Sequence, residues 1–282
     1  MGSTNTIKVR HVDFGLEKQI PNNWFKGNFL ITHFVNSFHL IFPDGEKYFI
    51  RSVKAHEEFI QDIELKKIIK AFIAQEVVHG NEHKTFWDTL KKQGYDIDTF
   101  LNLYNATTYD FLEPNLKKIF GAKHALAVTV ALEHFTASLA EFAFKDLKEL
   151  EGVPENMRQM LLWHASEEIE HKSVAFDVLK AVDDSYALRI RGLIHATVTL
   201  SVYTIIGFVM FMLQEVKKGT IITPFEFWEF FTHFISLIQT MGKEIAHYMQ
   251  PGFHPDQVAN EHLAQYFFEK YQVEKVKLKV AV

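Results

Sequence analysis

The sequence of 282 residues contains no cysteine. This absence excludes disulfides, thiolate zinc sites, iron–sulfur clusters and cysteine nucleophiles. Any metal ion bound by the chain must therefore be held by histidine, aspartate and glutamate side chains. The 15 histidines are numerous and give the first indication that a metal is bound.

Proline and glycine are also scarce, with seven and 13 residues. Few breakers favour long uninterrupted helices over a turn-rich β architecture. Phenylalanine is abundant, with 27 residues, which predicts a large aromatic core. The formal net charge is −5, so the chain lacks the basic field that a nucleic-acid partner requires. We therefore expect an all-α protein that binds no nucleic acid.

Several common motifs are absent too. The sequence contains no G-x-S-x-G, G-x-G-x-x-G or P-loop motif, which disfavours serine-nucleophile chemistry and dinucleotide or P-loop phosphate binding. The N-terminal residues lack the apolar segment of a secretory signal, so we expect a cytoplasmic location. Residues 1–6 formally match a myristoylation pattern, but so short a pattern often arises by chance. The alternating basic tail at 272–282 is expected to be loosely held.

Hydrophobic periodicity predicts a series of helices separated by short breakers. An aromatic helix at 22–40 should end before Pro43, and Asp44 can cap the next helix. We treat 1–282 as one domain, with a metal-binding helical bundle at about 40–182 and a hydrophobic helical extension at about 188–250. The further helices of the bundle are expected at about 44–60, 63–93, 97–112, 115–149 and 155–182.

Residues 193–213 form an uncharged run of 21 residues, which is long enough to span a bilayer. Arg189 and Arg191 precede this run, and Lys217 and Lys218 follow it. An aromatic segment comes next, so the two could form a hydrophobic hairpin. A buried hairpin, a membrane-associated hairpin and a homodimer interface remain open as interpretations.

The segment at 63–93 carries polar residues inside its apolar stripe. Spacings of three and four place them on one face of a helix. An acid and two imidazoles then lie where a core requires apolar groups, and a buried carboxylate needs a partner. Glu76-Val77-Val78-His79 is an E-x-x-H pair whose side chains converge. The stripe consists of Ile69, Phe72, Ile73, Glu76, His79, His83, Trp87 and Leu90.

The segment at 155–182 repeats this pattern. Glu168-Ile169-Glu170-His171 is a second E-x-x-H pair, and His164 lies one turn earlier on the same side. Two more acids, Glu133 and Glu46, each lie within an apolar run on a different helix. The sequence therefore places isolated acids on two helices and E-x-x-H pairs on two others.

This combination is the ligand set of a dinuclear carboxylate bundle. Glu46 precedes Glu76 by 30 residues and Glu133 precedes Glu168 by 35, so each helix pair can return antiparallel with its acids level. Four carboxylates with two or three imidazoles suit two Fe or Mn ions better than Ca or Mg. We expect His83 to be buried beside the site, or to be a further ligand. The expected ligands are Glu46, Glu76, His79, Glu133, His164, Glu168 and His171.

Other acids are less specific. Glu244-Ile245-Ala246-His247 also matches E-x-x-H and follows Glu215 by 29 residues. Glu215 lies at a helix end and is expected to be solvated, so we do not expect this pair to bind a metal. The other acids expected to point into solvent are Glu82, Glu167 and Glu170.

At these residues the chain resembles the ferritin-like di-iron carboxylate proteins, over about residues 40–182. The runs at 74–79 (AQEVVH) and 163–171 (WHASEEIEH) look like the bacterial family of predicted metal-dependent hydrolases. The H-x-x-x-E-x-x-H run that begins at His164 is similar to that of the di-iron arylamine N-oxygenases, in which the extra histidine is a ligand. The resemblance implies a ferritin-like four-helix bundle with additional N-terminal and C-terminal hydrophobic helices. The ligand roles that it implies are those of Glu76, His79, Glu133, His164, Glu168 and His171, and Glu46 corresponds to the first glutamate by spacing alone.

The leading hypothesis from the sequence is a non-haem di-iron oxygenase or oxidase. It would use O2, an electron donor and a small apolar or lipid-like substrate, with Fe/Fe favoured over Mn/Fe or other divalent metals. The alternative is a dinuclear hydrolase in which the bridged metals activate water. A third hypothesis is an iron-handling or structural membrane-associated protein.

Overall fold

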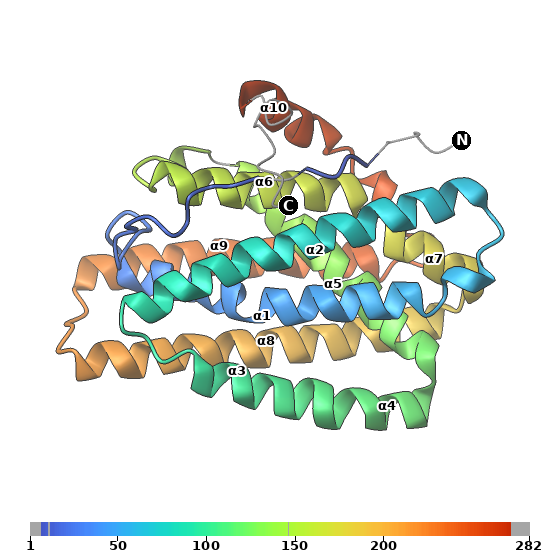
Figure 1. Ribbon diagram of the computed structural model, residues 1–282, viewed down its shortest axis with the longest axis horizontal. Helices are drawn as coiled ribbons and strands as arrows, with labels where there is room; N and C mark the ends of the chain where they lie inside the picture. The colour runs from blue at the N-terminus through green and yellow to red at the C-terminus, as the bar shows by residue number, and fades with distance from the viewer. Residues whose placement is uncertain (1–6, 11, 146, 272–282) are drawn as a thin grey trace, which may run out of the picture.

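The computed structural model describes residues 7–10, 12–145 and 147–271. These residues form helices joined by turns, with no β-strand among them, which confirms the predicted all-α class (Figure 1). The myristoylation pattern at 1–6 and the basic tail lie outside the described residues. The α-helices are α1 (Phe29–Lys54), α2 (Ile63–Lys92), α3 (Asp98–Tyr104), α4 (Glu113–Phe120), α5 (Ala122–Lys145), α6 (Glu155–His171), α7 (Val174–Val182), α8 (Tyr186–Lys217), α9 (Pro224–Tyr248) and α10 (Glu261–Tyr271). The shorter helical segments are η1 (Glu57–Phe59), η2 (Asn105–Leu112), η3 (Leu147–Leu150) and η4 (Pro255–Gln257).

Four long helices enclose the interior of the bundle. α1 packs along α2, and α5 packs against both α1 and α6. Figure 1 shows α2 between α1 and α6, with α8 on the other side of α1. α8 packs against α1 and α5, and α9 contacts the same two helices. The polar stripes of α1, α2, α5 and α6 consequently face one shared interior.

α1 is one continuous helix, and this corrects the prediction of two helices separated at Pro43. It begins at Phe29, where the Asn28 side chain accepts a hydrogen bond from the backbone N–H of Ile31, and it contains Pro43. Proline removes the hydrogen bond to the carbonyl four residues earlier, which belongs to His39. The indole Nε1 of Trp87 donates a 2.7 Å hydrogen bond to this carbonyl instead. The helix therefore passes through Pro43 because α2 supplies the missing donor, and no separate N-terminal helix forms.

Three further helix boundaries differ from the prediction. The segment expected to stop at Pro114 continues through a π-helical turn to Phe120, because Pro114 lies in the first turn of α4, where a missing N–H is tolerated. Gly121 ends α4 with a φ of 79°, so the long helix expected from 115 begins at Ala122. The helix expected at 155–182 is divided between His171 and Val174. By contrast, α2 has nearly the predicted bounds.

α5 and α8 are both long and apolar enough to cross a membrane, by length and composition alone. The apolar window of α5 is 67% buried inside the protein, whereas that of α8 is only 28% buried. α8 approaches α5 very closely at Gly192, where an added Cβ would collide with the carbonyl of Ala127. This contact fixes one side of α8 against the bundle and leaves the other side facing outward.

Candidate metal centre

The structure brings the predicted polar residues together in the bundle interior. α1 contributes one acid, α2 contributes an acid and two histidines, α5 contributes one acid, and α6 contributes an acid and two histidines. All of these side chains are buried although every one of them is polar. They are Glu46, Glu76, His79, His83, Glu133, His164, Glu168 and His171.

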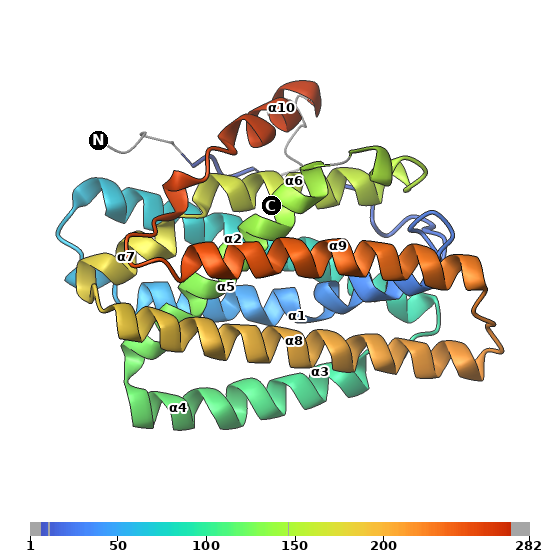
Figure 2. The same cartoon turned by 180° about the vertical axis from the view of Figure 1, so that it is seen from behind.

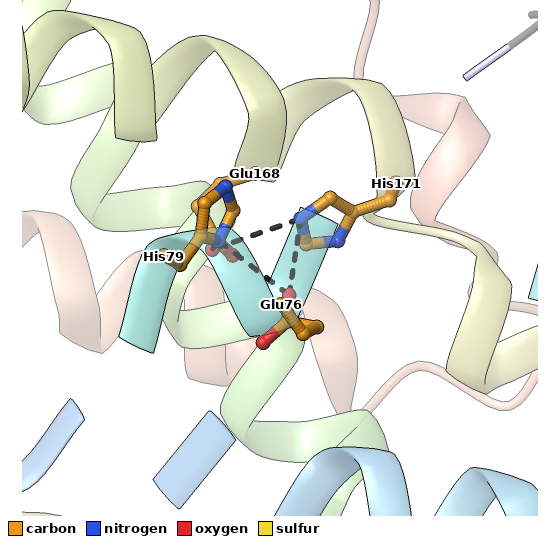
Figure 3. A group of neighbouring side chains, drawn as sticks. All are labelled: Glu76, His79, Glu168 and His171. Carbon is orange, nitrogen blue, oxygen red and sulfur yellow. Dashed lines mark ion pairs between the residues drawn. The ribbon is translucent and has the colours of Figure 1, made fainter. Parts of the chain in front are cut away.

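The two E-x-x-H pairs form the first group, which Figure 3 shows in close-up. One ligand atom from each of the four residues lies within 4.8 Å of the others. His79 Nδ1 is 3.5 Å from Glu168 Oε1, and His171 Nε2 is 3.3 Å from Glu76 Oε1. Each histidine therefore faces an acid of the opposite helix, so this group could hold a metal ion between α2 and α6.

Glu46, His83 and His164 form a second group whose ligand atoms also lie within 4.8 Å of one another. Glu46 Oε1 is 3.6 Å from His83 Nε2 and 3.8 Å from His164 Nε2. His164 Nε2 is also 2.9 Å from Glu168 Oε1, which connects this group to the first. Gly80 leaves room for the acid, because a Cβ there would lie 2.9 Å from Glu46 Oε2. The two groups adjoin, and each could hold a metal ion.

The histidines of the first group are oriented from outside by further carboxylates. His79 Nε2 is 3.0 Å from Glu167 Oε2, and His171 Nδ1 is 3.0 Å from Glu133 Oε2. Each of these bonds leaves the other ring nitrogen, His79 Nδ1 or His171 Nε2, directed toward the acids. Histidines that bind metals commonly donate their second N–H to a carboxylate in this way.

Glu133 occupies a different position from the other expected ligands. It is buried beside the first group but does not belong to either group. Its Oε2 contacts His171, while its Oε1 has no hydrogen-bonding partner among the described residues. Glu133 can therefore orient His171 with one oxygen and offer the other to a metal ion.

The unpaired atoms of the interior fit a pair of bound cations. Buried polar atoms are normally hydrogen-bonded, because leaving one unpaired costs about 1–3 kcal/mol. Here several inward-facing atoms lack a hydrogen-bonding partner of suitable geometry among the described residues. They are Glu46 Oε1 and Oε2, Glu76 Oε1 and Oε2, His79 Nδ1, Glu133 Oε1, His164 Nε2, Glu168 Oε2 and His171 Nε2.

The electrostatics of the metal-free interior also favour a cation. Burial and the neighbouring carboxylates raise the pKa of Glu76 well above its usual range. Burial raises the pKa of Glu46 to about 8 and that of Glu133 to about 7. Burial opposes ionisation of Glu168 as well, but contacts with His171, His164 and His79 hold its pKa below the usual range. Divalent ions would replace the protons that these acids otherwise retain.

His83 and His39 form a pair beside the second group. His83 Nδ1 is 2.8 Å from His39 Nδ1, so one ring donates across this contact and the other accepts. His83 offers its Nε2 lone pair to a metal only when its own Nδ1–H is the donor. Burial lowers the pKa of His39 to about 3, which keeps that ring neutral and able to accept.

The prediction that Glu167 is solvated was wrong. Its side chain is completely buried, contacts His79, and is paired with Arg10 at 3.0 Å. Arg10 also makes two hydrogen bonds of 2.6 and 2.8 Å to Glu170, which is half-buried rather than solvated. Glu82 is half-buried too. Glu167 is adjacent to Glu168 of the polar stripe, but its partner Arg10 is 157 positions away in the sequence. No local pattern in the sequence therefore predicts that Glu167 is buried.

The prediction that Glu215 is solvated was also wrong. Glu215 is buried and accepts hydrogen bonds from Tyr95 at 2.6 Å and from Thr220. Glu244 uses its backbone carbonyl to contact His134, and neither Glu244 nor His247 belongs to a metal-binding group among the described residues.

A cavity of about 590 Å³ extends from the second group toward α9. His83, His164 and Glu168 are among the polar residues that line it. The remaining walls are mainly apolar and come from α1, α5, α6 and α9. Aromatic side chains contribute much of this surface, namely Phe25, Phe34, Phe38, Phe42, Phe142, Phe230 and Phe234.

The comparison with known proteins agrees with a metal-binding interior. One family model, described as predicted metal-dependent hydrolase, matches residues 8–259, about nine-tenths of the chain. The match contains all of the polar residues described above. No curated protein and no solved structure matches the chain, so the resemblance to ferritin-like proteins and N-oxygenases remains a prediction. The chain belongs to the family of predicted metal-dependent hydrolases.

Proposed function

We propose that this protein is a dinuclear metal-dependent hydrolase whose substrate carries an apolar chain. The observation that carries the proposal is the convergence of buried, unpaired carboxylate and imidazole atoms beside an apolar cavity. The family description supports hydrolysis over the oxygenase hypothesis that the sequence favours.

In this proposal the two groups each hold one metal ion. The first ion would be held by Glu76, His79 and His171, and the second by Glu46 and His164. Glu168 of the first group also contacts His164 of the second, His83 is the remaining member of the second group, and Glu133 is a further candidate for a ligand. Oxygen and imidazole ligands suit Fe, Mn or Zn. When bound, such ions supply an activated water molecule and polarise a carbonyl or phosphoryl oxygen.

The protein side chains have three tasks in this scheme. Phe38, Phe42 and their apolar neighbours bind the chain of the substrate and exclude water from the cavity. Glu167 and Glu133 fix the rings of His79 and His171 from outside. His39 remains neutral and lines the cavity, so it can accept a hydrogen bond from a substrate or from His83.

Metal analysis combined with hydrolysis under anaerobic conditions tests this function. We expect about two metal ions per chain, and hydrolysis of acyl esters with Mn or Zn that needs neither O2 nor a reductant. Glu76→Ala and His171→Ala should lose the metals and the activity while keeping most of the helix content. The matched control is His247→Ala, which removes the histidine of the unrelated E-x-x-H and should change neither. Normal metal content in both site variants would contradict the ligand assignment.

A di-iron oxygenase is the second candidate function. It is favoured by the excess of buried carboxylates, Glu46, Glu76, Glu133 and Glu168, which provides hard oxygen ligands for two iron ions. This function needs O2 and an electron donor, and an apolar or lipid-like substrate would occupy the same cavity. O2 consumption that depends on Fe(II) and a reductant, without anaerobic hydrolysis, would favour it over the hydrolase.

A further inference from the structure

A row of exposed aliphatic side chains runs along the outer side of α8. The row extends for about 33 Å, from the rise per residue of a helix. Its members are between 44% and 68% exposed. In α8, which the structure describes in full, no exposed charged residue interrupts the row between its ends. It consists of Ile194, Val198, Val202, Ile205, Val209, Leu213 and Val216.

α9 and the turn before it continue this apolar surface. Of the described residues of α9, Tyr248 alone is buried, although the helix is rich in aromatic residues. The Phe230 ring of α9 stacks on the Phe208 ring of α8 at 5.4 Å, and Figure 2 shows the two helices side by side across one face. We call residues 186–248 the α8–α9 hairpin. Its other exposed apolar residues include Ile221, Ile222, Phe225, Phe227, Trp228, Phe231, Ile235 and Ile238.

So large an apolar surface on a folded protein indicates a binding partner. The charges of the hairpin indicate which one. Three acids of this segment are held by neighbouring groups of the protein: Glu215 by Tyr95, Glu226 by Thr223 and Glu229 by Asn28. The lysines of the same segment are exposed, at 217, 218 and 243. The fourth acid, Glu244, is half-buried, and Lys218 also pairs with Glu215 at 3.2 Å. The exposed charged side chains of the hairpin are thus all lysines, which complements an anionic surface.

The position of the turn favours a bilayer over a second copy of the chain as the binding partner. Figures 1 and 2 show that the turn between α8 and α9 forms one end of the molecule. Phe225 and Trp228 are 74% and 63% exposed there, close to Lys217 and Lys218. Aromatic residues beside lysines are typical of the boundary between lipid and water. Lysine is depleted from interfaces between proteins.

α8 lies on the protein instead of standing free for lipid to surround it. Gly192 and Gly207 bring its inner side close to α5 and α1. At its N-terminal end Arg189 is buried and donates hydrogen bonds to the backbone carbonyls of Tyr248 and Gln250. With one side fixed to the bundle, α8 can place only its outer row against a bilayer.

From these observations we propose that the α8–α9 hairpin binds the surface of an anionic lipid bilayer. The apolar row of α8 and the outer side of α9 face the lipid, and the aromatic turn inserts among the headgroups. The lysines contact the anionic headgroups. This arrangement covers the exposed apolar surface without moving α8 away from α5.

The same arrangement identifies the source of the substrate. Phe230, Phe234 and Leu237 of α9 line the cavity, whereas Phe231, Ile235 and Ile238 of the same helix are exposed. One helix therefore separates the bilayer from the cavity. We assign the acyl chain of a membrane lipid to the cavity, and this part rests on the proposed function.

Vesicle binding by the full chain tests the membrane surface directly. We expect the protein to float with vesicles of phosphatidylcholine and phosphatidylglycerol in equal parts, and to bind vesicles of phosphatidylcholine alone more weakly. Brominated lipid should quench Trp228, because Trp24 and Trp163 are buried and Trp87 is half-buried. The double variant Val202→Glu/Val209→Glu should reduce vesicle binding about tenfold or more, since it places two charges in the apolar row.

Ile63→Glu is the matched control. Ile63 is 70% exposed at the start of α2, outside the hairpin, so this variant should bind vesicles as the wild type does. Helix content and metal content should be normal in both variants. Vesicle binding that is absent in the wild type, or unchanged in the double variant, overturns the proposal. A wild-type dimer that the double variant dissociates, without any vesicle binding, assigns the surface to a second copy.

The two proposals can fail separately. Hydrolysis of a soluble short-chain ester without vesicle binding contradicts the membrane surface and leaves the hydrolase intact. Vesicle binding by a protein that holds no metal and hydrolyses no ester contradicts the hydrolase and leaves the membrane surface intact. If both hold, activity on esters of long acyl chains should increase when the ester is presented in anionic vesicles, and the double variant should lose this increase.

Discussion

The indole Nε1 of Trp87 donates a 2.7 Å hydrogen bond to the backbone carbonyl of His39. This carbonyl is the acceptor that the missing N–H of Pro43 leaves unpaired within α1. His39 and Glu46 lie on either side of Pro43 along the helix. A side chain of α2 thus maintains the part of α1 that carries the second metal-binding group.

Replacing Trp87 with phenylalanine should destabilise the protein by about 1–3 kcal/mol, because the variant retains an aromatic ring but leaves the carbonyl without a donor. Urea unfolding of the metal-free protein measures the change. Trp228→Phe is the control, since Trp228 is 63% exposed and should contribute little. Equal stability of the two variants would show that α1 does not depend on the bond from Trp87.

Gly80 should be necessary for the position of Glu46. A Cβ at residue 80 would lie 2.9 Å from Glu46 Oε2, so Gly80→Ala should displace this carboxylate. We expect metal content to fall from about two ions per chain toward one, with the first group still loaded. Elemental analysis after dialysis checks this result. Gly242→Ala in α9 is the control, because nothing lies near its added Cβ and alanine should stabilise the helix by up to about 1 kcal/mol.

Local spacing was sufficient to predict that the side chains of the first group come together. Glu76 and His79 lie one turn apart within an apolar stripe, as do Glu168 and His171, and the structure brings the four side chains together. The period of a helix determines which residues share a face, so this information is contained in the sequence around each pair.

Other features depend on partners that are distant in the sequence. The continuity of α1 at Pro43 requires Trp87, which lies 44 positions later. The burial of Glu167 requires Arg10 from the N-terminal segment. A local pattern contains neither contact, and for this reason the sequence predicted a break at Pro43 and a solvated Glu167.

Three buried acids of the metal-free protein, Glu46, Glu76 and Glu133, should contribute less to stability as pH rises. Burial raises the pKa of Glu76 well above 4.5, so the folded state keeps a proton that the unfolded chain releases above that pH. The same sign applies to Glu46, with a folded pKa of about 8, and to Glu133, with one of about 7. Stability from these protons is present below pH 4.5 and is lost toward pH 8.

The effect of Glu76→Gln on the free energy of unfolding should therefore change sign when metals bind. Without metal, we expect the variant to be about 1–2 kcal/mol more stable than the wild type at pH 8, because it buries no titrating carboxyl at this position. With metal, the wild type should be the more stable protein. Urea unfolding at pH 5.5 and 8, with chelator and with metal, measures both differences. An identical pH dependence of the two metal-free proteins would contradict the raised pKa.

Glu167 should control the metal affinity of His79 without being a ligand. Its Oε2 is 3.0 Å from His79 Nε2, so Glu167→Ala removes the partner that directs Nδ1 toward the acids. We expect the affinity for the first metal ion to fall about 10–100-fold, which is typical of losing such a partner. Competition with a chelator of known affinity measures the loss. Glu170→Ala is the matched control, because Glu170 also pairs with Arg10 but no described contact joins it to a histidine of the site. An equal loss in both variants would mean that Arg10 affects metal binding by fixing the N-terminal segment to α6, and not by holding the carboxylate that orients His79.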